Sequence, residues 1–216
     1  AMEIVYKKNQ LKNFVEEAFK AAENNPILID KFINNAMEVD VDAISDGDEV
    51  FVAGIMQHIE EAGVHSGDSA CSVPPYSLKK KIIDEIESQT TRLALALKIV
   101  GLINIQFAIV NDMVHIIEAN PRASRTVPFI SKAYKEPYVN YATKVMLGKK
   151  KVKDFTFSPT YNGYAIKEPV FSFNKFPNVN KQLGPEMKST GESILFIDTG
   201  SLSLPAKSLP VTRILY

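Results

Sequence analysis

The feature that most limits the fold of this chain is a pair of apolar segments, 102–110 and 113–120, separated only by Asn111 and Asp112. Both segments are rich in β-branched residues, and Asn-Asp is a common turn sequence. The pattern predicts an antiparallel hairpin. Because two strands alone are rarely stable in water, it also predicts a larger antiparallel sheet with helices packed against it.

The end of this hairpin carries polar side chains. With the turn centred on Asp112, Gln106 lies opposite Glu118 with β-carbons roughly 5 Å apart, and Asn120 follows on the same face. Carboxylate and amide oxygens suit a hard cation such as Mg²⁺ or Mn²⁺. The alternative is a hydrogen-bonded Gln–Glu pair without an ion, and the spacing alone leaves both interpretations open.

Two arginines, Arg122 and Arg125, follow directly after the hairpin. Guanidinium groups match the geometry of phosphate, so these side chains could bind an anion beside the cation. Surface arginines that pair with nearby acids are the alternative.

The rest of the chain alternates between strand-like and helix-like patterns. Apolar residues at helical spacing predict helices over 10–24, 77–100 and 131–149, the last interrupted by Pro137. Alternation and short apolar runs predict strands over 27–33, 37–44, 49–60, 165–173 and 191–197. Residues 61–75, rich in Gly and Ser, are typical of a loop. The sequence therefore indicates the α+β class.

Three acids share one face of the strand predicted over 37–44. Glu38, Asp40 and Asp42 alternate with apolar residues. For Asp40 and Asp42 the favoured interpretation is a half-solvated strand with these carboxylates in water.

Charge and cysteine content exclude several classes of function. The chain has 25 Lys and Arg against 25 Asp and Glu, so its formal net charge is zero. Nucleic-acid and membrane-surface binding usually require a basic excess, so we expect neither partner. The single cysteine, Cys71, excludes an internal disulfide and is typical of a reducing cytosol, so we expect a cytoplasmic location.

Several catalytic and binding motifs are absent from the sequence. The segment 65–69 contains His, Asp and Ser, but neighbours in sequence seldom form a hydrolase triad, and there is no G-x-S-x-G. The histidines lack the spacing of a structural zinc site. Neither a P-loop nor a G-x-G-x-x-G motif occurs.

Four segments together resemble the large subunit of carbamoyl phosphate synthetase. They are EAGVHSGDSACSVPPYSL (61–78), NIQFAI (104–109), IIEANPRASRTVPFISKA (116–133) and FNKFP…LGPEMKSTGE (173–192). That family carries two homologous ATP-grasp halves. The runs Val-His-Ser-Gly-Asp-Ser-Ala and Arg-Ala-Ser-Arg-Thr-Val-Pro-Phe resemble the second half, the one that phosphorylates carbamate. The resemblance implies the C-terminal part of an ATP-grasp domain.

The resemblance also implies the occupants of the polar strand ends, ATP with Mg²⁺ or Mn²⁺. It implies that Gln106, Glu118 and Asn120 bind the metal ions, and that Arg122 and Arg125 are catalytic residues at the γ-phosphate or the acyl phosphate. The implied nucleotide contacts are Lys31 and Ile33 at the adenine, Glu38 at the ribose, Gly63, Val64, His65 and Ser66 in a loop, and Gln106 and Glu118 through the metals.

The resemblance divides the chain into three parts. Residues 1–148 correspond to a partial ATP-grasp domain, truncated at its N-terminal side, and residues 149–199 to the segment that follows the domain. The family's phosphate loop is expected just before Ala1. Residues 200–216 form an atypical tail unlike the family's continuation, and a non-native origin is one interpretation of it. We therefore expect a fragment that is weak or inactive alone.

The implied reaction is the ATP-dependent phosphorylation of carbamate within a glutamine-hydrolysing enzyme that supplies pyrimidine or arginine biosynthesis. The implied partners are a glutamine amidotransferase small subunit and the remainder of the large subunit. One alternative is another ATP-grasp ligase such as a biotin-dependent carboxylase, which also ends a strand in Glu-x-Asn. A second alternative is a non-catalytic lobe that requires a separate partner chain.

Overall fold

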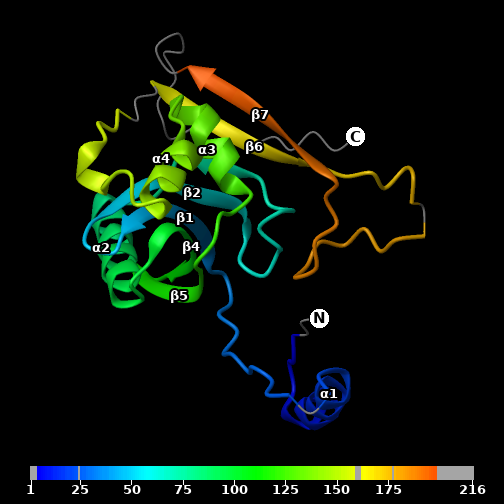
Figure 1. Ribbon diagram of the computed structural model, residues 1–216. Coiled ribbons are helices and arrows are strands. Elements are labelled where there is room, and N and C mark those ends of the chain that lie inside the picture. The colour runs from blue at the N-terminus through cyan, green and yellow to red at the C-terminus, as the bar shows by residue number, and fades with distance from the viewer. Residues whose placement is uncertain (1–3, 24, 159–161, 177, 199–216) are drawn as a thin grey trace.

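An antiparallel sheet forms the centre of this computed structural model, which describes residues 4–23, 25–158, 162–176 and 178–198 (Figure 1). The strand order is β5-β4-β1-β2-β3-β6-β7. The strands are β1 Met37–Asp46, β2 Val50–Glu61, β3 Cys71–Val73, β4 Val100–Val110, β5 Met113–Asn120, β6 Gly163–Val170 and β7 Gly191–Asp198. The helices are α1 Lys8–Ala21, α2 Lys80–Ala96, α3 Thr126–Tyr134, α4 Tyr138–Met146 and the 3₁₀ turn η1 Val152–Asp154. The antiparallel sheet with flanking helices confirms the expected α+β class.

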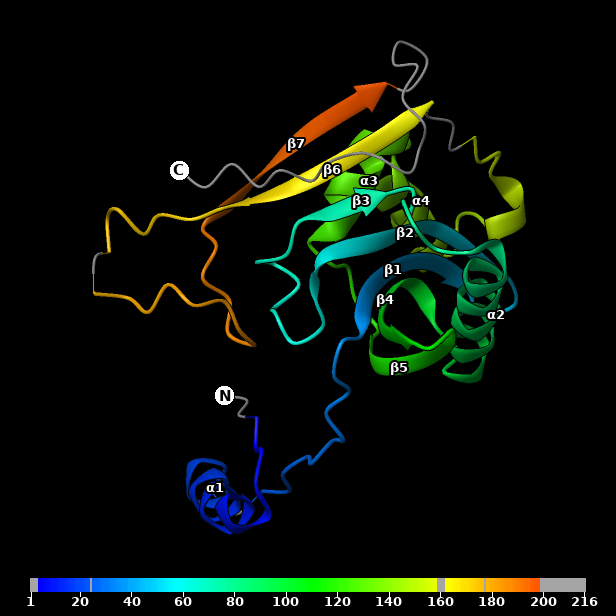
Figure 2. The same cartoon turned by 180° about the vertical axis from the view of Figure 1, so that it is seen from behind.

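Helix α2 covers one face of the sheet, where it lies against β1, β2, β4 and β5 (Figure 2). Its buried residues recur every fourth position, at Ile82, Ile86, Thr90 and Ala94, so one stripe of the helix faces the strands. The stripe packs on the apolar side chains of β1 and β4 that alternate with their polar ones. This alternation leaves the opposite face of the two strands for polar residues.

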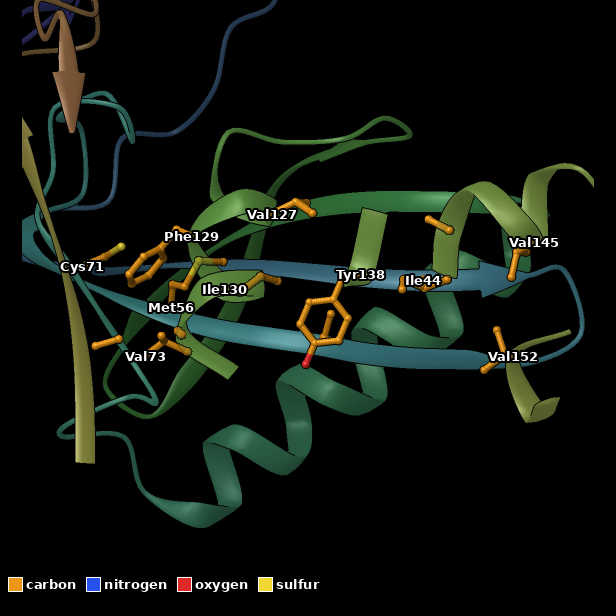
Figure 3. Close-up of a cluster of buried hydrophobic side chains, with 14 residues drawn as sticks. Ile44, Met56, Cys71, Val73, Val127, Phe129, Ile130, Tyr138, Val145 and Val152 are labelled. Carbon is orange, nitrogen blue, oxygen red and sulfur yellow. The ribbon is translucent and has the colours of Figure 1, made fainter. Parts of the chain in front are cut away.

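Helices α3 and α4 cover the opposite face and enclose a second apolar cluster (Figure 3). Phe129 and Ile130 of α3 and Tyr138 of α4 are fully buried against Ile44 and Met56 of the strands. Truncating a buried aromatic residue such as Phe129 to Ala should cost about 3–5 kcal/mol of stability. The predicted interruption of the helical pattern at Pro137 is confirmed, because α4 begins at the next residue.

Two sequence predictions fail in the N-terminal region. The strand predicted over 27–33 is wrong, because these residues are irregular and pair with no strand in the described part of the chain. Leu28 and Ile29 are 85% and 61% exposed, so the apolar run has no sheet to join. The predicted helix is confirmed as α1, but none of its residues is buried, and it lies apart from the sheet in both views (Figures 1 and 2).

The remaining boundaries change in smaller ways. The helix predicted over 77–100 is confirmed as the shorter α2, and the predicted loop 61–75 contains the short strand β3. Strands β6 and β7, in the segment expected to follow the ATP-grasp domain, extend the same sheet through β3. The atypical tail, 200–216, lies outside the described residues. None of the helices in the described ranges has the length and apolar character needed to cross a membrane.

Candidate functional site

The hairpin of β4 and β5 places Gln106 directly opposite Glu118, as predicted. The predicted turn was wrong, however. Asn111 and Asp112 both have positive φ, 51° and 60°, and form a two-residue loop that alone would pair Gln106 with Ile117. A bulge next to Gln106 skips Ile117 and returns Glu118 to the face of Gln106. The pairing therefore depends on the bulge as well as on the turn.

Three of the predicted site residues lie together at this point. Asn120 Nδ2 donates a hydrogen bond to Glu118 Oε1 at 2.7 Å, and Gln106 Nε2 donates to Ser66 Oγ at 3.4 Å. These bonds replace the direct Gln106–Glu118 bond of the alternative interpretation. Glu118 is exposed, while Gln106 and Asn120 are half-buried, so this end of the polar face is open to a ligand.

The donor set fits a hard cation and does not fit a soft one. No group of three or more His, Cys, Asp and Glu side chains in the described part of the chain could hold a metal ion. One carboxylate flanked by amide oxygens is instead the sparse oxygen set that Mg²⁺ accepts when phosphate and water complete its shell. Gln106, Glu118 and Asn120 therefore fit an ion shared with a bound phosphate.

The acids of β1 extend the polar face beside β4. Asp40 lies opposite Gln106, and Asp42 lies opposite Asn104. The half-solvated interpretation of Asp40 and Asp42 was wrong, because they are only 2% and 0% exposed. Helix α3 contacts Asp42, because Thr126 Oγ1 donates a hydrogen bond to Asp42 Oδ2 at 2.5 Å. Burial raises the pKa of Asp42 to about 6, and the hydrogen bonds from Thr126 and Asn104 only partly oppose this rise.

A buried histidine that the sequence analysis did not select lies between two of these acids. His58 Nε2 is 3.2 Å from Asp40 Oδ2, and His58 Nδ1 is 3.9 Å from Glu38 Oε1. Burial raises the pKa of Glu38, and the nearby His58 opposes that rise. The pairing of β1 with β2 brings His58 to the acids, so the sequence signal was a histidine on the strand predicted over 49–60, the next one along the chain after 37–44.

The loop after β2 brings the other expected nucleotide residues to the same place. Gly63 has a φ of +106°, which favours glycine, and its backbone forms a hydrogen bond with the Glu38 carboxylate. A Cβ at Gly63 would lie 3.4 Å from the Phe32 ring. Val64, His65 and Ser66 follow and are half-buried. Hydrogen bonds therefore link the loop both to the buried Glu38, through Gly63, and to the hairpin end, through Ser66 and Gln106.

The two arginines follow directly after the hairpin end. Both are exposed, and the Arg122 backbone N–H donates to the Asn120 carbonyl at 2.8 Å, which closes the turn after β5. Arg125 Nη1 contacts Met187 Sδ. Neither guanidinium takes part in an ion pair within the described ranges, so the alternative of pairing with local acids is not supported.

Lys31 and Ile33 are placed differently from the expectation. They lie in the irregular stretch before β1 rather than on a strand, with Lys31 exposed and Ile33 half-buried. Sequence reasoning identified an apolar run there, but a strand also requires a neighbouring strand to bond with. The expected adenine contacts therefore lack the sheet ladder that orients the hairpin end and the acids of β1.

Comparison with known proteins identifies the fold and the family. The solved structure of a biotin carboxylase–β-γ-ATP complex from Campylobacter jejuni superposes with a TM-score of 0.64 at 18% identity, covering 79% of this chain and 39% of that one. At this identity the likeness shows the ATP-grasp fold alone.

Sequence relatives are much more similar. The carbamoyl phosphate synthase large chain of Methanobrevibacter smithii is 55% identical over 198 residues, which cover 90% of this chain and 19% of the relative. The C-terminal section of that large chain in Aquifex aeolicus is 49% identical over 209 residues, covering 89% of this chain and 39% of the relative. The chain therefore spans about two fifths or less of these relatives.

The family model described as the carbamoyl-phosphate synthase L chain, ATP binding domain, matches residues 1–153. Those residues include the hairpin end, the acids of β1 and the loop after β2. The chain belongs to the family of carbamoyl phosphate synthase large-chain ATP-binding domains.

Proposed function

We propose that this chain forms the metal- and nucleotide-binding lobe that phosphorylates carbamate with ATP in the second half of a carbamoyl phosphate synthase large chain. The observation that carries the proposal is the hairpin end, where the register of β4 and β5 brings an acid and two amides together at an open edge. Such a set suits a divalent ion on a polyphosphate, and the family membership supports ATP as that ligand.

Assignment to the second half rests on the relatives and on the sequence motifs. The Aquifex aeolicus relative is itself called the C-terminal section of the large chain. The segments around His65 and Arg122 also resemble the second half of the family rather than the first. We therefore expect the complete protein to work with the remainder of the large chain and with a glutamine amidotransferase small subunit.

The proposed reaction transfers one phosphoryl group. A carbamate oxygen attacks the γ-phosphorus of ATP, the bond from that phosphorus to the β–γ bridging oxygen breaks, and ADP and carbamoyl phosphate form. Mg²⁺ or Mn²⁺ held by Gln106, Glu118 and Asn120 would neutralise charge on the phosphate oxygens. Arg122 and Arg125, exposed beside that edge, would offset charge on the transferred group.

The nucleotide-binding residues hold and orient the substrate. The Glu38 carboxylate would accept hydrogen bonds from the ribose hydroxyls, and the loop Gly63–Ser66 would line the nucleotide between the ribose and the metals. Lys31 and Ile33 would contact the adenine. Because the chemistry needs mainly position and charge, no protein side chain has to form a covalent intermediate.

The test is a replacement experiment in a complete enzyme. Residues 37–192 of this chain would replace the matching segment of the Methanobrevibacter smithii large chain, and ATP formation from MgADP and carbamoyl phosphate would be measured. We expect activity in the replaced enzyme and its loss when Glu118→Gln is added. ADP formation that requires biotin would instead indicate a carboxylase.

Activity and binding assays of the isolated chain distinguish the remaining alternatives. Full-rate ATP formation by the 216-residue chain would show that it is not a dependent lobe. Magnesium-dependent nucleotide binding by the chain, combined with an inactive replaced enzyme, would favour a non-catalytic module.

A further inference from the structure

A segment outside the matched family model holds the candidate nucleotide loop. The family model ends at residue 153, whereas residues 167–189 bond directly to the loop after β2. Figures 1 and 2 show this loop beside the segment that leads into β7. Residues 65–68 of the loop each form at least one of these bonds. The bonds are His65 N to Gly184 O at 2.8 Å, Lys167 Nζ to Ser66 O at 2.9 Å, Ser189 Oγ to Gly67 O at 2.8 Å, Lys188 N to Asp68 Oδ2 at 2.7 Å, and Ser189 N to Asp68 Oδ1 at 2.7 Å.

Asp68 is the centre of this set. Its side chain is fully buried, and each carboxylate oxygen accepts one backbone N–H, from Lys188 and from Ser189. A carboxylate can accept both bonds at once, and such charge-assisted bonds are strong. The residue was not among those assigned to ATP or metal by the sequence analysis, although it lies in the same motif as His65 and Ser66.

Lys167 forms the second attachment. It is 2% exposed on β6, and its ammonium donates to the Ser66 carbonyl. The hydroxyl of the same Ser66 accepts the Gln106 amide at 3.4 Å. A displacement of the loop at Ser66 would therefore reach the proposed metal residue Gln106.

We propose that Asp68 is a positioning residue for the nucleotide. Its hydrogen bonds hold residues 182–190 against the loop after β2, and Lys167 holds the same loop at Ser66. We call these contacts the clasp, and they keep the loop in the position that binds ATP. This inference rests on the proposed function, because it takes the occupant of the loop to be ATP. It adds to that function a role for β6 and the segment before β7. Residues outside the matched domain are then part of the nucleotide site.

The chain contains a matched control for Asp68. Asp46 is also a buried carboxylate that joins two distant segments by accepting backbone N–H bonds. Asp48 and Glu49 donate to its Oδ1 at 3.0 and 2.9 Å, and Val152 donates to its Oδ2 at 2.7 Å. It lies at the turn between β1 and β2. Asp46→Asn should thus lower the stability about as much as Asp68→Asn does, while the hydrogen bonds of the loop after β2 stay intact.

The experiment compares Asp68→Asn with Asp46→Asn in the 216-residue chain. A fluorescent ATP analogue reports affinity with and without Mg²⁺, hydrogen exchange reports the protection of backbone amides, and thermal unfolding reports stability. An asparagine offers one acceptor to two N–H donors, so one bond is lost. We expect a dissociation constant raised about 10-fold in Asp68→Asn and changed less than about 2-fold in Asp46→Asn. Faster exchange should be confined to residues 65–69 and 182–190 in the first variant.

Two milder variants cover the case in which Asp68→Asn does not fold. Ser189→Ala removes the bond to the Gly67 carbonyl, and Lys167→Met removes the bond to Ser66. Both should weaken nucleotide binding, by about 3-fold or more, and speed exchange in the loop while the amides of β4 keep their protection.

Each result decides the question. Unchanged affinity in folded Asp68→Asn, or in both milder variants if it does not fold, overturns the positioning role, as does equal weakening by Asp46→Asn. If the wild-type chain shows no magnesium-dependent binding, the nucleotide role of the clasp fails, whereas the proposed function fails only if the replaced large chain is also inactive. Hydrogen exchange distinguishes the two failures, because it reports whether Asp68 holds the loop even when no nucleotide binds.

Discussion

The phosphate side of the proposed site, Gln106, Glu118 and Asn120, differs in construction from its base side, Lys31 and Ile33. The first three residues lie on paired strands, and backbone ladders fix their relative positions. The last two lie in an irregular stretch with no strand partner in the described part of the chain. Residues in a ladder keep their geometry without ligand, whereas an unpaired stretch has to be ordered by what it binds.

This difference predicts where the binding free energy is concentrated. A site that is already arranged loses little entropy when the ligand arrives, so its contacts contribute strongly to affinity. Contacts from an exposed, irregular segment are offset by the entropy lost on ordering it. Substitutions on the phosphate side should therefore weaken nucleotide binding far more than substitutions on the base side.

The largest effect is expected for Glu118→Gln. Substituting groups that merely support a metal ligand typically costs 10–100-fold in affinity, so loss of the only proposed carboxylate ligand should cost about 100-fold or more. Glu118 is exposed, so the melting temperature should change little. Titration of nucleotide with and without Mg²⁺ measures the loss, and Glu87→Gln, at an exposed position of α2, is the control. An unchanged magnesium dependence would remove the metal site from the proposal.

The second prediction concerns the buried acid beside the phosphate side. The pKa of Asp42 is raised to about 6 by burial, from an ordinary value of 3.8, so the folded chain holds this proton more tightly than the unfolded chain. Stability from this group is therefore present at low pH and is lost as the pH rises from about 4 to about 6. The loss should amount to roughly 3 kcal/mol.

Asp42→Asn removes this titration. Urea unfolding at several pH values between 4 and 7 should show wild type losing stability relative to the variant as the pH rises, with no further change above about pH 6. Parallel stability curves would mean that Asp42 titrates normally and that its surroundings are wetter than its burial indicates.

Whether a structural feature of these regions could be predicted from the sequence depends on how far apart its interacting residues lie in the chain. The hairpin of β4 and β5 was predictable because its strands are adjacent in the chain. Its register was predicted correctly only because a bulge at Ile117 offset a misplaced turn, and no residue type there signals a bulge. The burial of Asp42 was not predictable, because the helix that contacts it contributes Thr126 from 84 residues further along the chain.

The same limit applies to the clasp. Asp68 bonds to residues 120 and 121 positions away, which no local pattern encodes. The resemblance to a known family located the motif that contains Asp68 but assigned it no contact. Distant pairings of this kind follow from the assembled sheet, in which β3 joins β6 to the strands of the site.

A smaller effect is expected on the base side. Lys31 is exposed, and solvent screens an exposed ammonium, so Lys31→Ala should raise the dissociation constant for ATP by less than about 5-fold. Lys20→Ala, another exposed lysine near the N-terminus, is the matched control. If Lys31→Ala is as damaging as Glu118→Gln, bound nucleotide orders the stretch before β1, and the contrast between the two sides disappears on binding.

The smallest effect is expected at the tip of the hairpin that builds the phosphate side. Lys81 and Lys79 bond to Asp112 and lower its pKa, so any stability from these pairs is present at neutral pH and is lost as the pH falls through the lowered pKa. The pairs are exposed and screened by salt, so Asp112→Asn should shift the melting temperature by less than about 2 °C. Asparagine also accepts the positive φ of the turn, so nucleotide affinity should stay unchanged. Asp112→Val, which strains that turn, should lower stability clearly more. If it also weakens nucleotide binding, the turn and not the bulge alone sets the pairing of Gln106 with Glu118.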